Sequence, residues 1–422
     1  MKYNRTEISD GLGLSSIIDK KLKYCLITVN FITKLDISTA SDNFLAFNAL
    51  TDSSLDYNTI SAMNRVLSDL YGSEIYTSVF QFGDLQILSV NSSWLADKYA
   101  LEGEDISGEI LRIFSGCLFR PNVTDGKFND ESFTINRNDL LDRIDSELNN
   151  KHTYAINRAM ETAFKGEPAE IIDYGTKETA QAASPSSLYK AYKRIFETSQ
   201  IEAFFVSPTE NNAVEKMLRD GFSSFERRPQ KYRFFNPSPL KPEPVVIKET
   251  FDVLQCKMVM IFKSDSDDLY AMIMLSMIFG EMPTSKLFAN VREKLSLCYY
   301  CSSTFMASKN IMLVTCGIDR CNIEKAKDEI IRQLDEIKNG ELSDDEINNA
   351  VLSFQNNLER FGDTPSSYVA WYWERICGGT LLTPEEMIEL LRNISKERII
   401  NAAKSFSIDS TYIMLNKEDI DS

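Results

Sequence analysis

The stretch Gln255–Phe262, QCKMVMIF, is a short apolar run with the composition of a buried β-strand. A similar run, Tyr24–Phe31 (YCLITVNF), stands at the corresponding place in the first half of the chain. After each run the sequence predicts two helices, then a two-stranded hairpin, then an amphipathic helix with a single apolar stripe. Each half closes with a further strand, Ala203–Val206 and Tyr412–Leu415. The same order of elements in both halves indicates a duplicated α+β domain.

A proline-rich stretch separates the two halves. Four prolines lie between Asn236 and Val245 in a polar context, and residues of this kind interrupt helices and central strands. We therefore expect an N-terminal domain at 1–226, a linker at 227–244 and a C-terminal domain at 245–422. The two tandem domains should be homologous, each a mostly antiparallel sheet with helices packed on one face. Within each, Ser184-Pro185 or Thr383-Pro384 predicts the start of a helix.

Charge and composition exclude several classes of protein. The 422 residues include 46 Lys and Arg against 62 Asp and Glu, which gives a net charge of −16. This excess of negative charge disfavours nucleic acid and anionic membranes as partners. No apolar run is long enough for a membrane span or a signal peptide, so we expect a cytoplasmic protein. Its eight cysteines suit a reducing compartment.

The single histidine, His152, limits the chemistry further. A self-contained zinc enzyme of the HExxH or HxxEH type needs two histidines and is therefore excluded. A cysteine–histidine hydrolase would need a cysteine beside His152, and nothing in the sequence selects one. Cys298 and Cys301 have CxxC spacing, but residues three apart on a strand face opposite sides. We therefore expect neither a redox pair nor a metal site there.

The string Ser285–Tyr300, SKLFANVREKLSLCYY, is the most specific in the chain. It predicts the end of an amphipathic helix, a tight turn and the first strand of a hairpin. Arg292 on the last helical turn and Tyr299 on the strand can both point toward one sheet edge. A guanidinium and a phenol are donors to a peptide carbonyl, or to the oxyanion that forms when it is attacked. The alternative is a solvated Arg292 that caps the helix and a half-buried Tyr299.

This string resembles the C-terminal-domain signature S-R-L-F-x-x-x-R-E-K-x-G-L-A-Y of the insulinase/pitrilysin family of inverted-motif zinc peptidases. The identical positions are Ser285, Leu287, Phe288, Arg292, Glu293, Lys294, Leu297 and Tyr299. Lys286, Ser296 and Cys298 replace the family's arginine, glycine and alanine, and the Arg/Tyr pair is retained. The resemblance extends over nearly the whole chain. It implies two strand-rich sheets with helices on one side, facing each other around a closed chamber.

The resemblance also implies that a zinc site has been lost. Family members bind zinc through H-x-x-E-H on the first helix of the N-terminal domain, with the glutamate as base for the attacking water. In the matching stretch, Asn43 and Phe47 replace the histidines and Ala46 replaces the glutamate. The third ligand, a glutamate on a later helix, corresponds to Asp142. One carboxylate without an imidazole would not hold a catalytic zinc, so we expect no metal or other cofactor in this chain.

In dimeric members of the family, a chain with the zinc motif can pair with one that lacks it. We therefore expect a noncatalytic subunit of a heteromeric zinc peptidase, inactive alone, whose zinc lies in an HxxEH-bearing partner chain. Arg292 and Tyr299 would contact the peptide substrate or its oxyanion in the partner's site. The alternative is an inactive peptide-binding or scaffolding homodimer, in which these two residues are structural.

Overall fold

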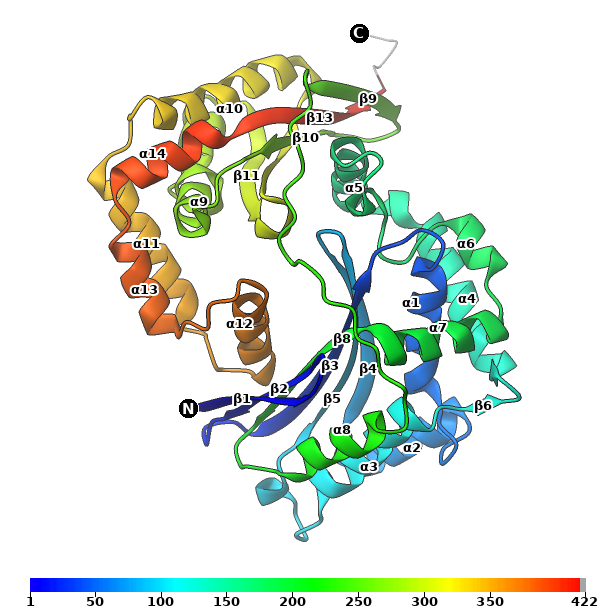
Figure 1. Cartoon of the computed structure of the whole chain (residues 1–422). Coiled ribbons are helices and arrows are strands. Elements are labelled where there is room, and N and C mark those ends of the chain that lie inside the picture. Colours follow the sequence, from blue (N-terminus) through cyan, green and yellow to red (C-terminus); the bar gives the residue numbers. More distant parts are fainter. Residues whose placement is uncertain (418–422) are drawn as a thin grey trace. The chain divides into compact units, whose positions relative to one another are not determined.

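The computed structural model describes residues 1–417, so the last residues of the predicted C-terminal domain lie outside the described part (Figure 1). The chain forms two compact units. The first comprises Met1–Ser146, Ile171–Phe234 and Phe361–Cys377. The second comprises Glu147–Glu170, Phe235–Arg360 and the chain from Gly378 onward.

The first unit is built on a six-stranded sheet in the order β1-β2-β8-β3-β5-β4. Its strands, in chain order, are β1 (Lys2–Ser9), β2 (Leu12–Ile18), β3 (Tyr24–Lys34), β4 (Glu74–Phe82), β5 (Leu85–Leu95) and β8 (Gln200–Ser207). Strands β2 and β8 are parallel, and the other neighbouring pairs are antiparallel. The helices of this unit are α1 (Ala40–Asp52), α2 (Ile60–Asp69), α3 (Ile106–Phe119), α4 (Asp130–Asp145), α6 (Lys177–Ala182), α7 (Pro185–Thr198), α8 (Ala213–Phe222) and α12 (Pro365–Cys377). A short hairpin, β6 (Val123–Thr124) and β7 (Lys127–Phe128), precedes α4.

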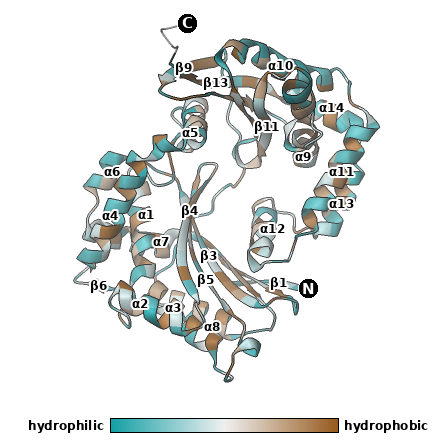
Figure 2. Ribbon diagram, turned by 180° about the vertical axis from the view of Figure 1, so that it is seen from behind, coloured by the Kyte–Doolittle hydropathy of each residue, from teal (hydrophilic) through white to brown (hydrophobic). Residues whose placement is uncertain are grey.

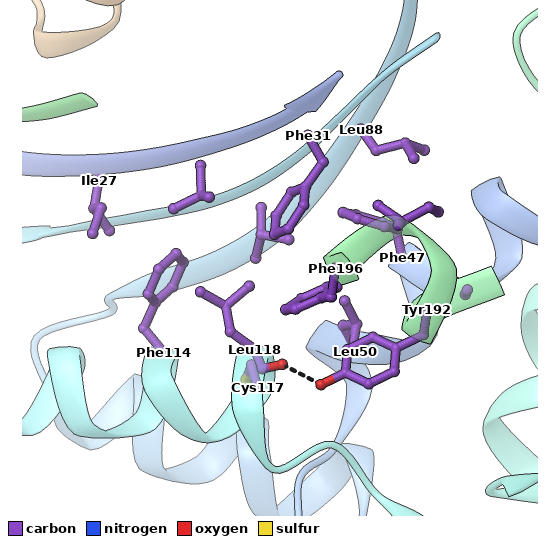
Figure 3. Packing of buried hydrophobic residues seen from close by; sticks show 14 of the residues in the cluster. Ile27, Phe31, Phe47, Leu50, Leu88, Phe114, Cys117, Leu118, Tyr192 and Phe196 are labelled. Atoms are coloured by element: carbon purple, nitrogen blue, oxygen red, sulfur yellow. Dashed lines mark hydrogen bonds between the residues drawn. The ribbon is translucent and has the colours of Figure 1, made fainter. Parts of the chain in front are cut away.

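The main core of this unit lies between the sheet and helices α1, α3 and α7 (Figure 3). Phe31 of β3 and Phe196 of α7 meet there with ring centroids 4.6 Å apart. The hydroxyl of Tyr192 donates a hydrogen bond of 2.9 Å to the carbonyl of Leu118, which satisfies the one polar atom of this buried ring. Figure 2 shows hydrophobic residues along β3 and β5, and hydrophilic residues over much of α4 and α6.

The second unit has a five-stranded sheet in the order β11-β12-β10-β13-β9. Its strands are β9 (Val245–Phe251), β10 (Cys256–Lys263), β11 (Cys298–Met306), β12 (Ile311–Ile318) and β13 (Ser407–Asn416). Its helices are α5 (Lys151–Ala163), α9 (Leu269–Ser276), α10 (Ile323–Lys338), α11 (Asp344–Leu358), α13 (Pro384–Arg392) and α14 (Lys396–Ser405), with π-helical segments at Met277–Glu281 and Leu287–Lys294. Here β13 and β9 are the parallel pair.

The two sheets confirm the duplication. The order β2-β8-β3-β5-β4 in the first sheet matches β9-β13-β10-β12-β11 in the second. In each, the first two strands are parallel and every later pair is antiparallel, and the last two strands form a hairpin. The α+β class with mostly antiparallel sheets is confirmed. Both predicted helix starts are also confirmed, because the hydroxyls of Ser184 and Thr383 accept hydrogen bonds from the backbone N–H groups of Ser187 and Glu386.

In addition to the helices expected on one face, each sheet carries one helix on its other face, contributed by the opposite half of the chain. On β4, Ile75 and Val79 pack against the main core, whereas Phe80 and Phe82 contact Trp373 of α12. Alternate residues of a strand face opposite sides, so α12 covers the second face. In the second unit, α5 covers β10 and β13 in the same way. The boundaries at 226 and 245 stay a prediction of where one sequence repeat ends and the next begins. The sequence did not predict that α5 and α12 would each pack on the sheet of the other half.

Among residues 1–417, no helix is both long enough and apolar enough to cross a membrane.

Candidate functional site

The stretch that matches the family's zinc motif lies on α1 and is buried in the first unit. The Asn43 side chain is fully buried, and its amide donates a hydrogen bond of 2.7 Å to Oε1 of Gln86 on β5. Its carbonyl oxygen accepts a hydrogen bond from the guanidinium of Arg194 on α7. The Gln86 amide in turn donates to the backbone carbonyls of Ala40 and Asp173. An amide and guanidinium network therefore occupies the place of the first histidine, and its polar groups satisfy one another.

The other two positions of the motif are apolar. Ala46 and Phe47 are fully buried, and the Phe47 ring lies 5.1 Å from that of Phe31 and 6.4 Å from that of Phe196 (Figure 3). Neither side chain carries an atom that can bind a metal ion. The residues on α1 therefore do not fit a zinc ion.

Asp142, the expected counterpart of the third ligand, is exposed on α4. The next residue, Arg143, is the one that reaches toward α1, with its guanidinium 5.5 Å from the Phe44 ring and 4.5 Å from the Tyr174 ring. The hydrogen-bond partners of the Asn43 side chain are Gln86 and Arg194, not Asp142. Two guanidinium groups, those of Arg143 and Arg194, border the degenerate motif, and their charge opposes a divalent cation.

A titratable carboxyl group lies beside this network. Burial raises the pKa of Asp173 to about 6, although the charge of Arg143 acts in the opposite direction. Because the pKa is raised, the folded state favours the protonated carboxyl group. Any stability that this group contributes is present below its usual pKa of about 4 and is lost as the pH rises through 6.

We expect the Asp173→Asn variant to remove this pH dependence. Between pH 4 and pH 7 the wild type should lose about 2 kcal/mol of unfolding free energy relative to the variant, because ionisation of the buried carboxyl group is costly. Urea unfolding followed by circular dichroism across this range measures the difference. Asp142→Asn, at an exposed position of the same unit, is the matched control. Parallel pH profiles for wild type and Asp173→Asn would contradict the expectation.

The Arg/Tyr pair lies in the second unit. Arg292 is on the π-helical segment Leu287–Lys294, which packs against β11. Its side chain is exposed, with the guanidinium 4.8 Å from the Phe288 ring and Nε 3.6 Å from Glu293. Because the side chain is exposed, its guanidinium keeps N–H donors that a ligand can reach. π-Helical turns are rare in proteins as a whole, but those that occur are often at functional sites.

Tyr299 is the extra residue of a β-bulge at the start of β11. The register passes from Cys298 opposite Ile318 to Tyr300 opposite Gly317, which leaves Tyr299 without a partner across the ladder. Bulges of this kind re-aim a side chain at a sheet edge, and β11 is an edge strand. Tyr299 is 59% exposed.

The Tyr299 hydroxyl donates to the carboxylate of Asp319, at 3.2 Å from Oδ1. The charge of this carboxylate raises the pKa of Tyr299, so the phenol remains a protonated donor. Arg292 and Tyr299 thus lie on consecutive elements and are both exposed, but each contacts a different group. Local sequence patterns did not identify Asp319, Gln86 or Arg194 as partners, because these contacts join residues 20, 43 and 151 positions apart in the chain.

His152, the single histidine, lies on α5 in the second unit. Its Nδ1 is 3.2 Å from the hydroxyl of Tyr300, and their rings meet edge to face. Burial lowers the pKa of His152, which favours the neutral ring. His152 therefore takes part in a hydrogen bond with a tyrosine of β11.

A protein-family profile described as "Peptidase M16 inactive domain" matches residues 182–354. The chain is 22% identical over 424 residues to "Probable inactive metalloprotease YmfF" of Bacillus subtilis, with 99% of each chain covered. It is 23% identical to an "Uncharacterized zinc protease" of Rickettsia bellii, over 71% of this chain and 73% of the relative.

Solved structures share the fold. A conserved protein from Enterococcus faecalis aligns over the whole of both chains with a TM-score of 0.90 and 23% identity. A protease from Helicobacter pylori aligns with a TM-score of 0.80 and 14% identity, over 98% of this chain and 99% of that one. A peptidase M16 inactive domain from Pseudomonas fluorescens aligns with a TM-score of 0.79 and 14% identity, over 99% and 98%.

Proposed function

Because the chain belongs to the insulinase/pitrilysin family, that is, the M16 peptidases, as an inactive member, we propose that it is the noncatalytic subunit of a heteromeric zinc peptidase. A separate chain with an HxxEH motif would hold the zinc ion and activate the water. This chain would supply Arg292 and Tyr299 to the substrate in the partner's site. The observation that carries the proposal is the contrast between the two loci. Core and amide residues fill the zinc motif, whereas both donors of the Arg/Tyr pair remain exposed.

The chemistry of the two donors suits this role. When water attacks a peptide carbonyl, negative charge develops on the oxygen, and donors fixed near that oxygen stabilise it. The Arg292 guanidinium is always charged. The Tyr299 phenol is held protonated by its neighbour Asp319 and can turn its hydrogen toward a carbonyl when the bond of 3.2 Å to Asp319 breaks.

The substrate we propose is an extended, basic peptide. Strands β4 and β11 are edges of the two sheets, and a peptide can add to such an edge through backbone hydrogen bonds. The net charge of −16 attracts basic segments. All eight cysteines are free thiols, which supports a cytoplasmic location for the complex.

We expect Arg292→Ala to reduce kcat/KM of the mixed complex by about 100-fold, which is the usual effect of removing one oxyanion donor. The measurement is cleavage of a basic peptide by the complex purified with its partner, with and without a chelator. Lys294→Ala, which removes an exposed positive charge from the same helical segment, is the matched control and should leave turnover unchanged. Unchanged turnover in Arg292→Ala would show that the assigned role is wrong.

The second candidate is an inactive peptide-binding or scaffolding homodimer. One observation favours it: Arg292 and Tyr299 each already have a partner within the chain, Phe288 and Asp319. Affinity purification from native cells separates the two proposals. Recovery of a similar-sized chain with HxxEH and chelator-sensitive cleavage supports the heteromeric peptidase. Recovery of a homodimer without such a chain supports the scaffold.

A further inference from the structure

Three cysteines of the second unit converge at one end of the hairpin β11–β12. The sulfur atoms of Cys298, Cys301 and Cys316 all lie within 4.8 Å of one another. Cys301 and Cys316 are directly opposite each other across the antiparallel ladder. Cys301 is 4% exposed and Cys316 is fully buried, whereas Cys298 is half-buried at the border of the cluster.

The bulge at Tyr299 creates this cluster. We expected Cys298 and Cys301 to face opposite sides of the strand, because their spacing is odd. This expectation was wrong, since the extra residue shifts the alternation by one position and returns both side chains to one face. Cys316 on β12 points to the same face, because it is opposite Cys301. Three thiols from two strands therefore share one small volume.

The spacing of the sulfur atoms suits a metal ion better than a covalent bond. A zinc ion holds each thiolate at about 2.3 Å, which places the sulfur atoms of one site roughly 4 Å apart. The three sulfur atoms, all within 4.8 Å of one another, already lie close to that separation. A disulfide would join only two of them, at about 2 Å, and would leave the third thiol buried beside it.

The surroundings also suit such a site. Three thiolates with a divalent or monovalent ion carry net negative charge, and Arg292 is close enough to Cys298 to interact with it electrostatically. Two of the sulfur atoms are shielded from water, which protects bound metal from exchange. The partial exposure of Cys298 leaves an open side for the entry of the ion and for an external fourth ligand.

We propose that Cys298, Cys301 and Cys316 form a three-thiolate site for a thiophilic metal ion with a filled d shell, Zn²⁺ or Cu⁺. Binding replaces the three thiol protons, which pass to the solvent, by three metal–sulfur bonds. The site lies in the second unit, whereas the degenerate zinc motif lies in the first, so the proposal departs from the expectation that this chain holds no metal. A metal ion here fixes the bulge and with it the position of Tyr299. The proposal does not depend on the proposed function.

The experiment uses the full chain, together with its partner where one co-purifies, prepared without oxygen and stripped of metal. Co²⁺ serves as the first probe, because thiolate ligands give it an intense charge-transfer band. Zn²⁺ is then added to displace Co²⁺, and Cu⁺ is tested separately against a chromophoric copper chelator. The wild type should bind about one ion per chain. Whichever of Zn²⁺ and Cu⁺ binds more tightly is the metal that the site prefers.

Single substitutions to serine locate the site. Cys298→Ser, Cys301→Ser and Cys316→Ser should each weaken binding at least about tenfold, since each removes a ligand. Cys321→Ser is the matched control, because Cys321 is exposed, lies on the turn after β12 and is outside the cluster. Where a buried substitution prevents folding, alkylation of the wild type gives the answer, because bound metal should slow the reaction of Cys298.

Two results would overturn the proposal. In the first, the wild type binds Zn²⁺ and Cu⁺ no more tightly than the three cluster variants do, and neither ion slows the alkylation of Cys298. The other is a disulfide between two of the three cysteines in protein alkylated at the moment of cell lysis, which would identify a redox pair instead.

Discussion

Asp409→Ala is expected to lower the unfolding free energy of the second unit by about 3–5 kcal/mol, because it leaves two lysine ammonium groups without their buried counter-charge. Asp409 on β13 is fully buried. Its carboxylate lies 2.8 Å from Nζ of Lys241 and 3.2 Å from Nζ of Lys263, which is itself only 3% exposed. Burial lowers the pKa of Lys263, whereas Asp409 acts in the opposite direction. Removal of the carboxylate therefore exposes the full cost of burying the charge.

The same two lysines hold the end of α5. Lys241 donates to the backbone carbonyls of Thr162 and Ala163, and Lys263 donates to that of Ala163. These carbonyls belong to the last turn of a helix, where the backbone acceptors lack partners within the helix. Since α5 comes from the other half of the chain, the network fastens the exchanged helix to its sheet. Loss of Asp409 should therefore loosen α5 first.

The measurement can separate the two units. All three tryptophans, Trp94, Trp371 and Trp373, belong to the first unit, so their fluorescence reports on that unit alone. Hydrogen exchange of α5 and β13 reports on the second. Asp409→Ala should lose protection in these segments, whereas Asp265→Ala, at an exposed position of the same unit, should not. A stability change below about 1 kcal/mol would contradict the inference that the buried charges depend on Asp409.

Patterns within a few residues of one another predicted much of the fold. The apolar runs at Tyr24–Phe31 and Gln255–Phe262 became the strands β3 and β10, and serine or threonine before proline marked two helix starts. The exchange of α5 and α12 could not be predicted in this way. An amphipathic stripe shows that a helix has a buried face, but it does not show which sheet that face covers.

The sites depended on still finer detail. The replacement of the zinc ligands at Asn43 and Phe47 could be predicted from the sequence, since the two histidines are absent from it. The contacts that Gln86 and Arg194 make with Asn43 could not be predicted, because they join distant segments of the chain. The single extra residue at Tyr299 places Cys298 on the same face of the sheet as Cys301, opposite to the face expected from their spacing. A bulge of one residue is difficult to recognise from the pattern of apolar residues.

Restoring the zinc motif with Asn43→His, Ala46→Glu and Phe47→His together is expected to destabilise the first unit by more than about 5 kcal/mol, without creating a zinc site. Phe47 packs in the aromatic core with Phe31 and Phe196, and loss of a buried phenylalanine costs about 3–5 kcal/mol. Ala46 is fully buried, so a glutamate there would place a carboxylate among apolar side chains.

Zinc is not expected to recover this loss. Metal binding can stabilise a fold only when the ligands converge on a shared position, and the third position, Asp142, is exposed on α4. The guanidinium groups of Arg143 and Arg194 reach toward the motif and repel a divalent cation. Restoring three residues therefore leaves the site without a third ligand and with two opposing charges.

The test compares thermal unfolding and zinc content of the triple variant with those of Phe47→Leu, a control that keeps the site apolar and should cost less than about 1.5 kcal/mol. A folded triple variant that binds one zinc ion and gains stability from it would refute the argument. Because the core has repacked around Phe47 and the amide network has closed around Asn43, reversal of the motif needs changes at Arg143, Arg194 and Asp142 as well. The inactive state is thus maintained by the packing and charges around the motif as well as by the missing ligands.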